Sequence, residues 1–133
     1  IERDHVWVTN AVKHFRYRSD GPGARRIHAT PEGRHVTACR PWLAAELNRI
    51  RPAIVVILGA TAGQSLVGPS FRVTRMRGRL LEGPPGSGAR LLATLHPSAI
   101  LRTPPDARDE AYAGFVRDLG VAVAALGPSG APS

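Results

Sequence analysis

Short runs of apolar residues predict three strands. Residues 5–9 (HVWVT) are β-branched and aromatic and end at Asn10, which suits a short buried strand. Residues 53–58 (AIVVIL) form an unbroken apolar run, which is typical of a strand covered on both faces. Residues 91–95 (LLATL) form a third run directly before His96. We therefore expect a sheet built from short, buried strands.

Apolar residues spaced three or four positions apart predict helices. The first covers residues 36–50 and ends just before Pro52, a shorter one covers residues 60–67, and the last covers residues 106–126. The expected apolar face consists of Cys39, Trp42, Leu43, Leu47 and Ile50 in the first helix, and of Tyr112, Phe115, Val116, Leu119, Val123 and Leu126 in the last.

The segments between these elements are rich in arginine, glycine and proline. Residues 15–34 have no apolar period and predict a long basic loop, and loops of this length tend to be functional or disordered. Residues 71–81 predict a basic hairpin with its turn near Gly78. GPPGSG at 83–88 predicts a further loop, and residues 128–133 a frayed tail.

Strands that alternate with helices predict an α/β fold of three layers, with a short, mostly parallel sheet between helices. Ligands of such sheets bind beyond the carboxyl ends of the strands. Asn10, Gly59 and His96 follow the three expected strands. We therefore expect these three residues to lie on one rim of the sheet.

Composition and charge narrow the class of protein. The chain has 133 residues, which suits one domain, and no window of 18 uninterrupted apolar residues, which argues against a membrane span. Its single cysteine fits a reducing compartment, and we expect a cytoplasmic protein. It opens on Ile1 and has Met76 as its only methionine, so we expect a piece of a longer protein.

Eighteen Lys and Arg against ten Asp and Glu give a net charge of +8. Such a charge favours a polyanionic partner, because basic side chains that pair with phosphates release counterions. The alternative is the codon bias of a GC-rich genome, which favours arginine, and charge alone does not decide between the two.

Several residues could carry chemistry, each with a plain structural alternative. His96, stiffened by Pro97, could hydrogen-bond an oxygen that gains charge, and Ser98 could contact a phosphate, or the three residues could form an ordinary turn. Asn10 has the amide needed to recognise a pyrimidine edge, or it caps a turn. His14 and Cys39 could be metal ligands, although core roles fit two isolated residues better.

The stretch Arg25-Arg26-Ile27-His28 is the most unusual part of the long loop. The two arginines could meet phosphates, and the imidazole could act as a base or a nucleophile. The alternative is a solvated basic loop in which His28 has no chemical role.

Six segments carry a resemblance to a known family. They are VTNAVKHF (8–15), RRIH (25–28), ACRPWL (38–43), VVILGATA (55–62), FRVTRMRG (71–78) and ATLHPSAIL (93–101). Together and in this order they resemble the family 4 branch of the uracil-DNA glycosylase superfamily, and within it the uracil-DNA cross-linking class, UdgX. The resemblance runs from Ile1 to about Leu126 and implies the three-layer α/β/α fold of that superfamily.

The resemblance implies a role for each matching residue. Asn10 corresponds to the residue that recognises uracil, His96 to the one that stabilises the departing uracil at its carbonyl oxygen, and Ser98 to a residue near the DNA backbone. RRIH resembles the loop that sets the cross-linking class apart. In that class the histidine, here His28, attacks C1′ after uracil leaves and stays bound to the abasic DNA.

The flanking arginines of this loop, Arg25 and Arg26, would then clamp the neighbouring phosphates. The resemblance further implies iron–sulfur ligands: Cys39 matches a ligand of a [4Fe–4S] cluster, and His14 stands where family 4 has another cysteine. The family's Gly-Glu-x-Pro-Gly motif and Cys-x-x-Cys pair have no counterpart here. We therefore expect an amino-terminally truncated domain over residues 1–127, without its first strand–helix unit and unable to hold the cluster by itself.

The function implied by the resemblance is DNA repair in a bacterial cytoplasm. We expect the intact protein to be a monomer that flips uracil out of single-stranded DNA, excises it and ends as a covalent His28–DNA adduct. The fragment alone is expected to be inactive. Two other hypotheses stay open. One is a glycosylase with ordinary turnover whose RRIH loop only grips DNA, and the other is a basic DNA-binding module without catalysis.

Overall fold

A small three-stranded sheet lies at the centre of the protein, whose computed structural model describes residues 2–14, 16–19, 21–23 and 27–127. Strand β3 (Ile54–Leu58) pairs in parallel with β5 (Arg90–Thr94), and β4 (Leu80–Glu82) pairs antiparallel with β5, so the order is β3-β5-β4. Leu58 lies opposite Thr94 at the last pair of the parallel ladder. The runs at 53–58 and 91–95 thus form neighbouring strands whose carboxyl ends lie side by side.

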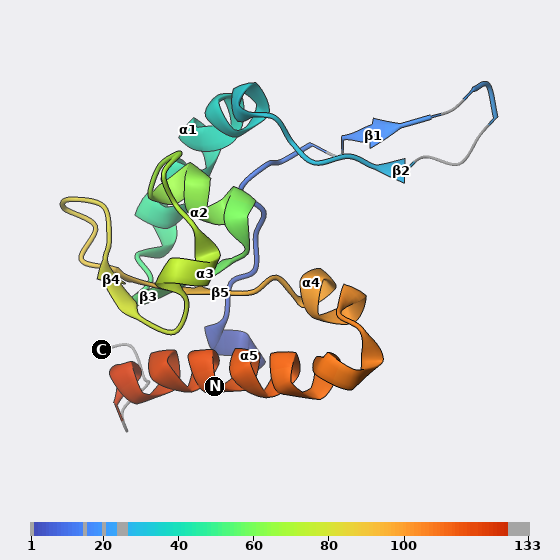
Figure 1. The fold of residues 1–133 in the computed structure, drawn as a ribbon. Coiled ribbons are helices and arrows are strands. Elements are labelled where there is room, and N and C mark those ends of the chain that lie inside the picture. Colours follow the sequence, from blue (N-terminus) through green and yellow to red (C-terminus); the bar gives the residue numbers. More distant parts are fainter. Residues whose placement is uncertain (1, 15, 20, 24–26, 128–133) are drawn as a thin grey trace.

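Helices cover both sides of this sheet, as Figure 1 shows. Helix α5 (Pro105–Leu126) packs against β3 and β5. Helix α2 (Ala60–Leu66) packs against β3, α1 (Gly33–Ile50) packs against α2, and the short α3 (Val73–Met76) packs against β5. Helix α4 (Pro97–Arg102) connects β5 to α5. The predicted three-layer α/β fold with a small, mostly parallel sheet is confirmed.

The main hydrophobic cluster consists of Ile57, Phe71, Leu91 and Ala93, each at most 2% exposed. A Cβ built on Gly63 of α2 would lie 2.0 Å from the ring of Phe71. Because only a hydrogen atom fits at that point, the glycine lets the helix lie directly on the ring. Burial of these side chains is the principal source of stability for the sheet and the helices on it.

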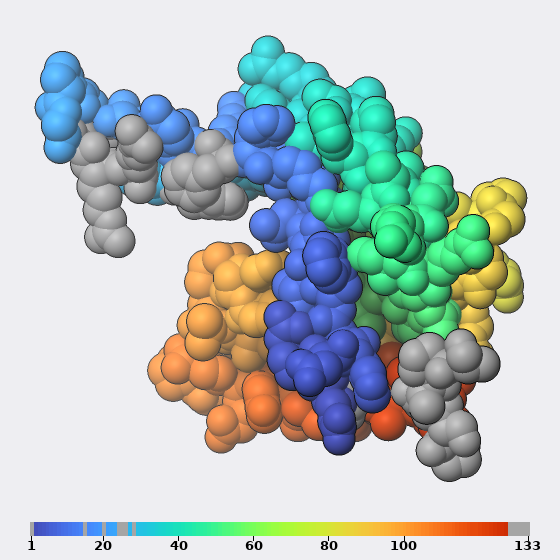
Figure 2. Space-filling model, turned by 180° about the vertical axis from the view of Figure 1, so that it is seen from behind, coloured from blue at the N-terminus to red at the C-terminus, as the bar shows by residue number. Residues whose placement is uncertain are grey.

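The amino-terminal segment does not form the strand predicted for residues 5–9. A short 3₁₀ helix, η1 (Arg3–His5), is followed by extended chain that pairs with no strand among the described residues. Trp7 and Val8 are 66% and 70% exposed. Figure 2 shows this segment, in blue, lying across one face of the molecule between the orange helices and the green ones. The side chains of residues 6–9 favour an extended backbone, which the chain adopts, but no neighbouring strand among the described residues pairs with it.

The hairpin predicted for residues 71–81 is also wrong. Residues 73–76 form α3, and β4 pairs instead with β5, across the loop at 83–88. The N–H of Gly83 donates to the carbonyl of Ala89 at 3.0 Å and closes that connection. The Gly- and Pro-rich segment is therefore the hairpin turn, and the basic segment before it contains the short helix α3, which packs against β5.

The long helices bury somewhat different faces from those predicted. α1 begins at Gly33 and buries Val36, Cys39 and Leu43, whereas Trp42 is 66% exposed. α5 turns small residues toward the sheet, with Gly114, Asp118 and Ala122 buried, and leaves Tyr112, Val116 and Val123 exposed. In the part of the chain that the structure describes, no helix is long and apolar enough to cross a membrane.

Candidate functional site

Gly59 and His96 meet at the carboxyl ends of the two parallel strands. The N–H of Gly59 donates to the carbonyl of Thr94 at 3.0 Å, and a Cβ built on Gly59 would lie 3.0 Å from the Cβ of His96. Gly59 also has a φ of +85°, which side chains rarely adopt. Both conditions require glycine here, and they bring the start of α2 against the base of the His96 side chain.

The side chain of His96 caps helix α4. Its Nδ1 accepts a hydrogen bond from the backbone N–H of Ser98 at 3.1 Å, and the Oγ of Ser98 lies 2.8 Å from the same nitrogen. Pro97 occupies the first helical position, where its fixed φ is favourable. Because Nδ1 is the acceptor, the single proton of the neutral ring lies on Nε2. His96 is exposed, and no hydrogen bond from Nε2 is found among the described residues, so this N–H is available as a donor.

A partly buried ion pair braces the strand that delivers His96. Asp118 of α5 accepts from the hydroxyl of Thr94 at 2.6 Å and from the Nε and Nη2 of Arg77 at 2.9 and 2.8 Å. Thr94, two residues before His96, is fully buried. A Cβ built on Gly78 would lie 2.7 Å from Asp118 Oδ1. The network ties α5 and the α3–β4 connection to the end of β5.

Asn10 lies on the exposed extended segment and not at the end of a strand. The structure therefore brings Gly59 and His96 together as predicted. Asn10, in contrast, does not follow a strand. The prediction of three strand ends on one rim holds for two of the three positions.

Ile27 and His28 of the RRIH stretch belong to an arm that leaves the body of the protein. β1 (Tyr17–Arg18) and β2 (Ile27–His28) form its antiparallel ribbon, with Tyr17 opposite His28. Arg25 and Arg26 lie outside the described residues. Figure 1 shows the ribbon extending from the start of α1. The predicted loop thus contains a β-ribbon, and His28 is on its returning strand.

Three contacts hold the two ends of this arm together. The N–H of Ala29 donates to the carbonyl of Arg16 at 2.9 Å, and the Nη1 of Arg16 donates to the carbonyl of Thr30 at 2.6 Å. The Nη2 of Arg16 pairs with Oε1 of Glu32, the N-cap residue of α1. The hydrogen bond and charge of Arg16, with a smaller contribution from Arg34, lower the pKa of the Glu32 carboxyl below 4.5.

His14 and Cys39 lie next to each other, with 3.6 Å between Nδ1 and Sγ. The thiol is 2% exposed and also accepts from the N–H of Lys13 at 3.3 Å. Among the described residues no group of three or more His, Cys, Asp and Glu side chains could hold a metal ion. A thiol and an imidazole are suitable iron ligands, but they are two donors, and a [4Fe–4S] cluster needs four.

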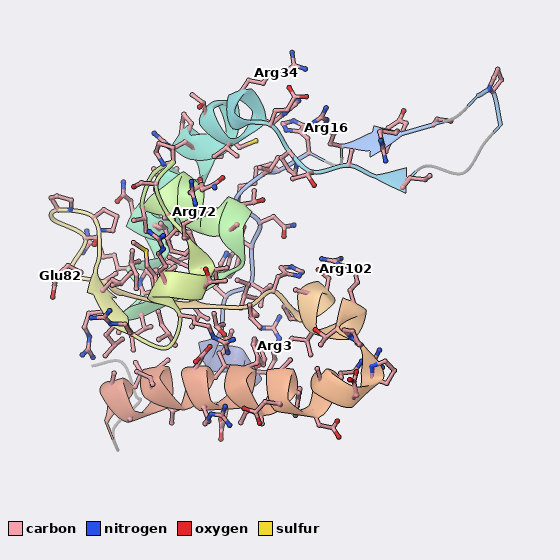
Figure 3. The ribbon with its side chains drawn as sticks, viewed as in Figure 1. Arg3, Arg16, Arg34, Arg72, Glu82 and Arg102 are labelled. Carbon is pink, nitrogen blue, oxygen red and sulfur yellow. The ribbon has the colours of Figure 1, made fainter. Side chains whose placement is uncertain are left out.

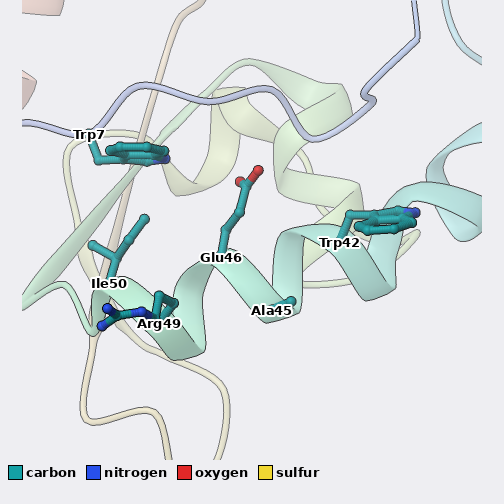
Figure 4. A pocket seen from close by; sticks show the side chains of 6 residues that line it. All are labelled: Trp7, Trp42, Ala45, Glu46, Arg49 and Ile50. Carbon is teal, nitrogen blue, oxygen red and sulfur yellow. The ribbon is translucent and has the colours of Figure 1, made fainter.

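A second surface feature is a shallow apolar groove between α1 and the amino-terminal segment. Figure 4 shows Trp7 and Trp42 at its two ends with Glu46 between them, and Arg49 and Ile50 complete the wall beside Ala45. The carboxylate of Glu46 is already engaged: hydrogen bonds from Lys13 and Thr9 lower its pKa. The groove therefore offers contact area and no free reactive group.

Sequence reasoning missed the residues that hold the site in place. Arg16, Glu32, Arg77, Thr94 and Asp118 make the contacts described above, and of these only Arg77 was considered from the sequence, as one of the arginines of the expected basic hairpin. One signal was available for Asp118, because a lone carboxylate within the apolar pattern of a long helix needs a buried partner. The other four carry no such signal, since their roles depend on contacts distant in sequence.

Known proteins show what the chain is similar to. The sequence model of the uracil DNA glycosylase superfamily matches residues 1–120. A type-4 uracil-DNA glycosylase of Thermotoga maritima is 33% identical over 103 residues, which cover 77% of this chain and 48% of the relative. That of Archaeoglobus fulgidus is 30% identical over 120 residues, 86% of this chain and 55% of the relative. The chain spans about half the length of these two relatives.

Proposed function

Because the chain belongs to the uracil-DNA glycosylase superfamily, we propose that the protein excises uracil from DNA and then becomes covalently attached to the abasic site through His28. The observation that carries the excision is the capped His96, whose Nδ1 is tied to Ser98 so that Nε2–H remains as the donor. A donor whose direction is fixed in advance stabilises a developing anion more than one that must reorient.

The reaction begins with base flipping, because no side chain reaches the glycosidic carbon of a stacked nucleotide. The C1′–N1 bond then breaks, and its electron pair leaves with uracil. His96 donates its Nε2–H to the uracil carbonyl oxygen on which negative charge collects. Asn10, with one donor and one acceptor in its amide, hydrogen-bonds the edge of the base.

His28 captures the sugar in place of water. A ring nitrogen of the neutral imidazole donates its lone pair to the electron-poor C1′ and forms a new C–N bond. The resulting imidazolium loses the proton of its other nitrogen, and the uracil anion gains one, so that charge and atoms balance. A positioned imidazole outcompetes water because its effective concentration is far higher. The resemblance of RRIH to the loop of the cross-linking class supports this step.

The preferred substrate in this proposal is single-stranded DNA held by arginines. The net charge of +8 supports a polyanionic partner, and Arg25, Arg26 and Ser98 would contact the phosphates on either side of the flipped uracil. We place this activity in the bacterial cytoplasm. The single free cysteine, Cys39, agrees with such a reducing compartment.

His14 and Cys39 would supply two ligands of a [4Fe–4S] cluster in the intact protein. Their contact at 3.6 Å supports this assignment, because it brings an imidazole and a buried thiol from separate segments to one point. A bound cluster would tie the amino-terminal segment to α1, and the excision steps above use only this chain's own side chains.

A single experiment separates the three hypotheses for the full-length protein. We expect it to convert a single-stranded oligonucleotide with one uracil into a complex that survives SDS and heat, while the His28→Gly variant releases uracil without that complex because water regains access to C1′. Uracil release by the wild type with no stable complex would support the turnover glycosylase instead. Binding without any uracil release would support the non-catalytic module.

Selection of uracil is tested by the Asn10→Ala variant. Loss of the amide should relax or abolish the preference for uracil over thymine, since the edge of the base is no longer recognised. The measurement compares base release from two oligonucleotides that differ only in that base. An Asn10→Ala variant with the full preference of the wild type would disprove this role.

A further inference from the structure

One arginine, Arg16, makes the contacts that hold the root of the arm together, where the root is Arg16 with residues 29–32. Arg16 immediately precedes β1, and its carbonyl oxygen accepts the N–H of Ala29, the residue after β2, at 2.9 Å. Its guanidinium donates from Nη1 to the carbonyl of Thr30 at 2.6 Å and from Nη2 to the carboxylate of Glu32. Arg16, just before the outgoing strand, thus binds the chain that follows the returning strand and the N-cap residue of helix α1.

Glu32, to which Arg16 binds, is itself held by contacts within helix α1. Glu32 forms a capping box with His35, whose Nδ1 accepts the N–H of Glu32 at 3.0 Å. The helix that follows buries Val36, Cys39 and Leu43 against the body. A guanidinium with two donors engaged on separate acceptors resists rotation, so the connection transmits the position of α1 to the ribbon.

His28 is the first paired residue of the returning strand beyond this root. It lies opposite Tyr17, whereas the pair of Arg18 and Ile27 lies one step further along the ribbon. Only Ala29 separates His28 from Thr30, the acceptor of Arg16. Figure 3 shows Arg16 where the ribbon meets α1, and Arg34 at the start of that helix. The backbone at His28 therefore takes its position directly from the contacts of Arg16.

From this geometry we infer that Arg16 is a positioning residue that decides whether His28 or water captures C1′. The inference rests on the proposed function, because it concerns the second of its two steps. Excision depends on His96 and the rim of the sheet, and capture depends on how the arm is held. Small displacements of a nucleophile cost much of its advantage over solvent, so a loosened root should divert the product toward free abasic DNA.

The test measures how the excised product divides. Full-length wild type and variants react with a labelled single-stranded oligonucleotide containing one uracil, and free uracil, heat-stable adduct and alkali-labile abasic DNA are quantified in the same sample. We expect Arg16→Ala to release uracil at close to the wild-type rate while its ratio of adduct to abasic DNA falls by about 10-fold to 100-fold. Arg16→Lys, which keeps one donor group, should give an intermediate ratio.

Arg34→Ala is the matched control. Arg34 pairs with the same carboxylate, Glu32, at 2.9 Å, but it makes no contact with the arm among the interactions of the described residues. We expect it to retain the wild-type ratio, whereas Glu32→Gln should lower the ratio in the same direction as Arg16→Ala.

Each other result contradicts the inference in a recognisable way. An unchanged ratio in Arg16→Ala would overturn it, as would a parallel loss of uracil release and adduct, which indicates a merely structural role. If the wild type releases uracil and forms no adduct, the proposed capture by His28 fails for every variant. That result contradicts the proposed function, whereas an adduct that forms equally well in Arg16→Ala contradicts only the role of Arg16.

Discussion

At the scale of single residues, the direction of one N–H bond carries most of the proposed chemistry. The Nδ1 of His96 accepts the hydrogen bond that caps α4, and this leaves Nε2 as the donor. The backbone N–H of Ser98 supplies one of the two contacts to Nδ1 and the hydroxyl supplies the other. The ring is thus oriented in part by the backbone N–H, a contact that a side-chain substitution at Ser98 does not remove.

This division predicts unequal effects of two substitutions. His96→Ala should slow uracil release by about 10²-fold to 10³-fold, the usual effect of losing one donor to a developing anion. Ser98→Ala should slow it by only about 5-fold, since one hydrogen bond of roughly 1 kcal/mol is lost while the N–H contact remains. Single-turnover rates at saturating protein measure both, with the exposed Ser70→Ala as control. Equal losses at positions 96 and 98 would contradict this account.

At the scale of elements, α2 depends on a glycine for its place on the sheet. Gly63 lies under the ring of Phe71, whereas a Cβ built on Gly120 in α5 meets nothing within 4 Å. Gly63→Ala should therefore destabilise the full-length protein by about 1–3 kcal/mol through overpacking. Gly120→Ala should stabilise it by about 0.5–1 kcal/mol, because alanine favours a helix. Denaturant unfolding measures both changes, and the same sign for the two would refute this packing.

The ion pair of Arg16 and Glu32 should make the stability of the first turn of α1 depend on pH. Arg16 lowers the pKa of Glu32 in the folded protein, so folding favours the charged carboxylate. Its stabilisation is complete above the ordinary value of 4.5 and is lost as the pH falls through the lowered pKa. The effect is small because Glu32 is exposed to solvent.

Hydrogen exchange in the first turn of α1 measures this loss. Protection should fall in the wild type as the pH drops below 4.5. In Glu32→Gln and in Arg16→Ala the change over that range should be smaller, after correction for the intrinsic exchange rates. Wild type and both variants with the same profile would show that the ion pair does not stabilise the turn.

At the scale of the whole molecule, the sequence predicts the elements that are determined by their own apolar pattern. The runs at 53–58 and 91–95 become β3 and β5 within one residue, and His96 follows the end of β5 as expected. Gly59 and His96 meet because the carboxyl ends of neighbouring parallel strands coincide. These results need only periodicity and one general rule about parallel sheets.

The elements that need a distant partner could not be predicted from a local pattern. Residues 5–9 have strand-forming side chains but pair with no strand among the described residues, and Leu80–Glu82 pairs with β5 rather than within 71–81. The bracing pair of Arg77 and Asp118 spans 41 positions. Nothing near either residue in the sequence identifies the other, so the support of the site becomes visible only in the fold.

The central claim, that this protein removes uracil and retains the DNA on His28, is tested most directly by the mass of one peptide. Trypsin cleaves after Arg26 and Arg34 and yields the peptide 27–34, IHATPEGR, which contains His28. After reaction of the full-length protein with a uracil oligonucleotide and nuclease digestion, we predict that this peptide carries the residual deoxyribose phosphate on its histidine. An unmodified peptide in a sample that has released uracil, or a modification on another peptide, would contradict the claim.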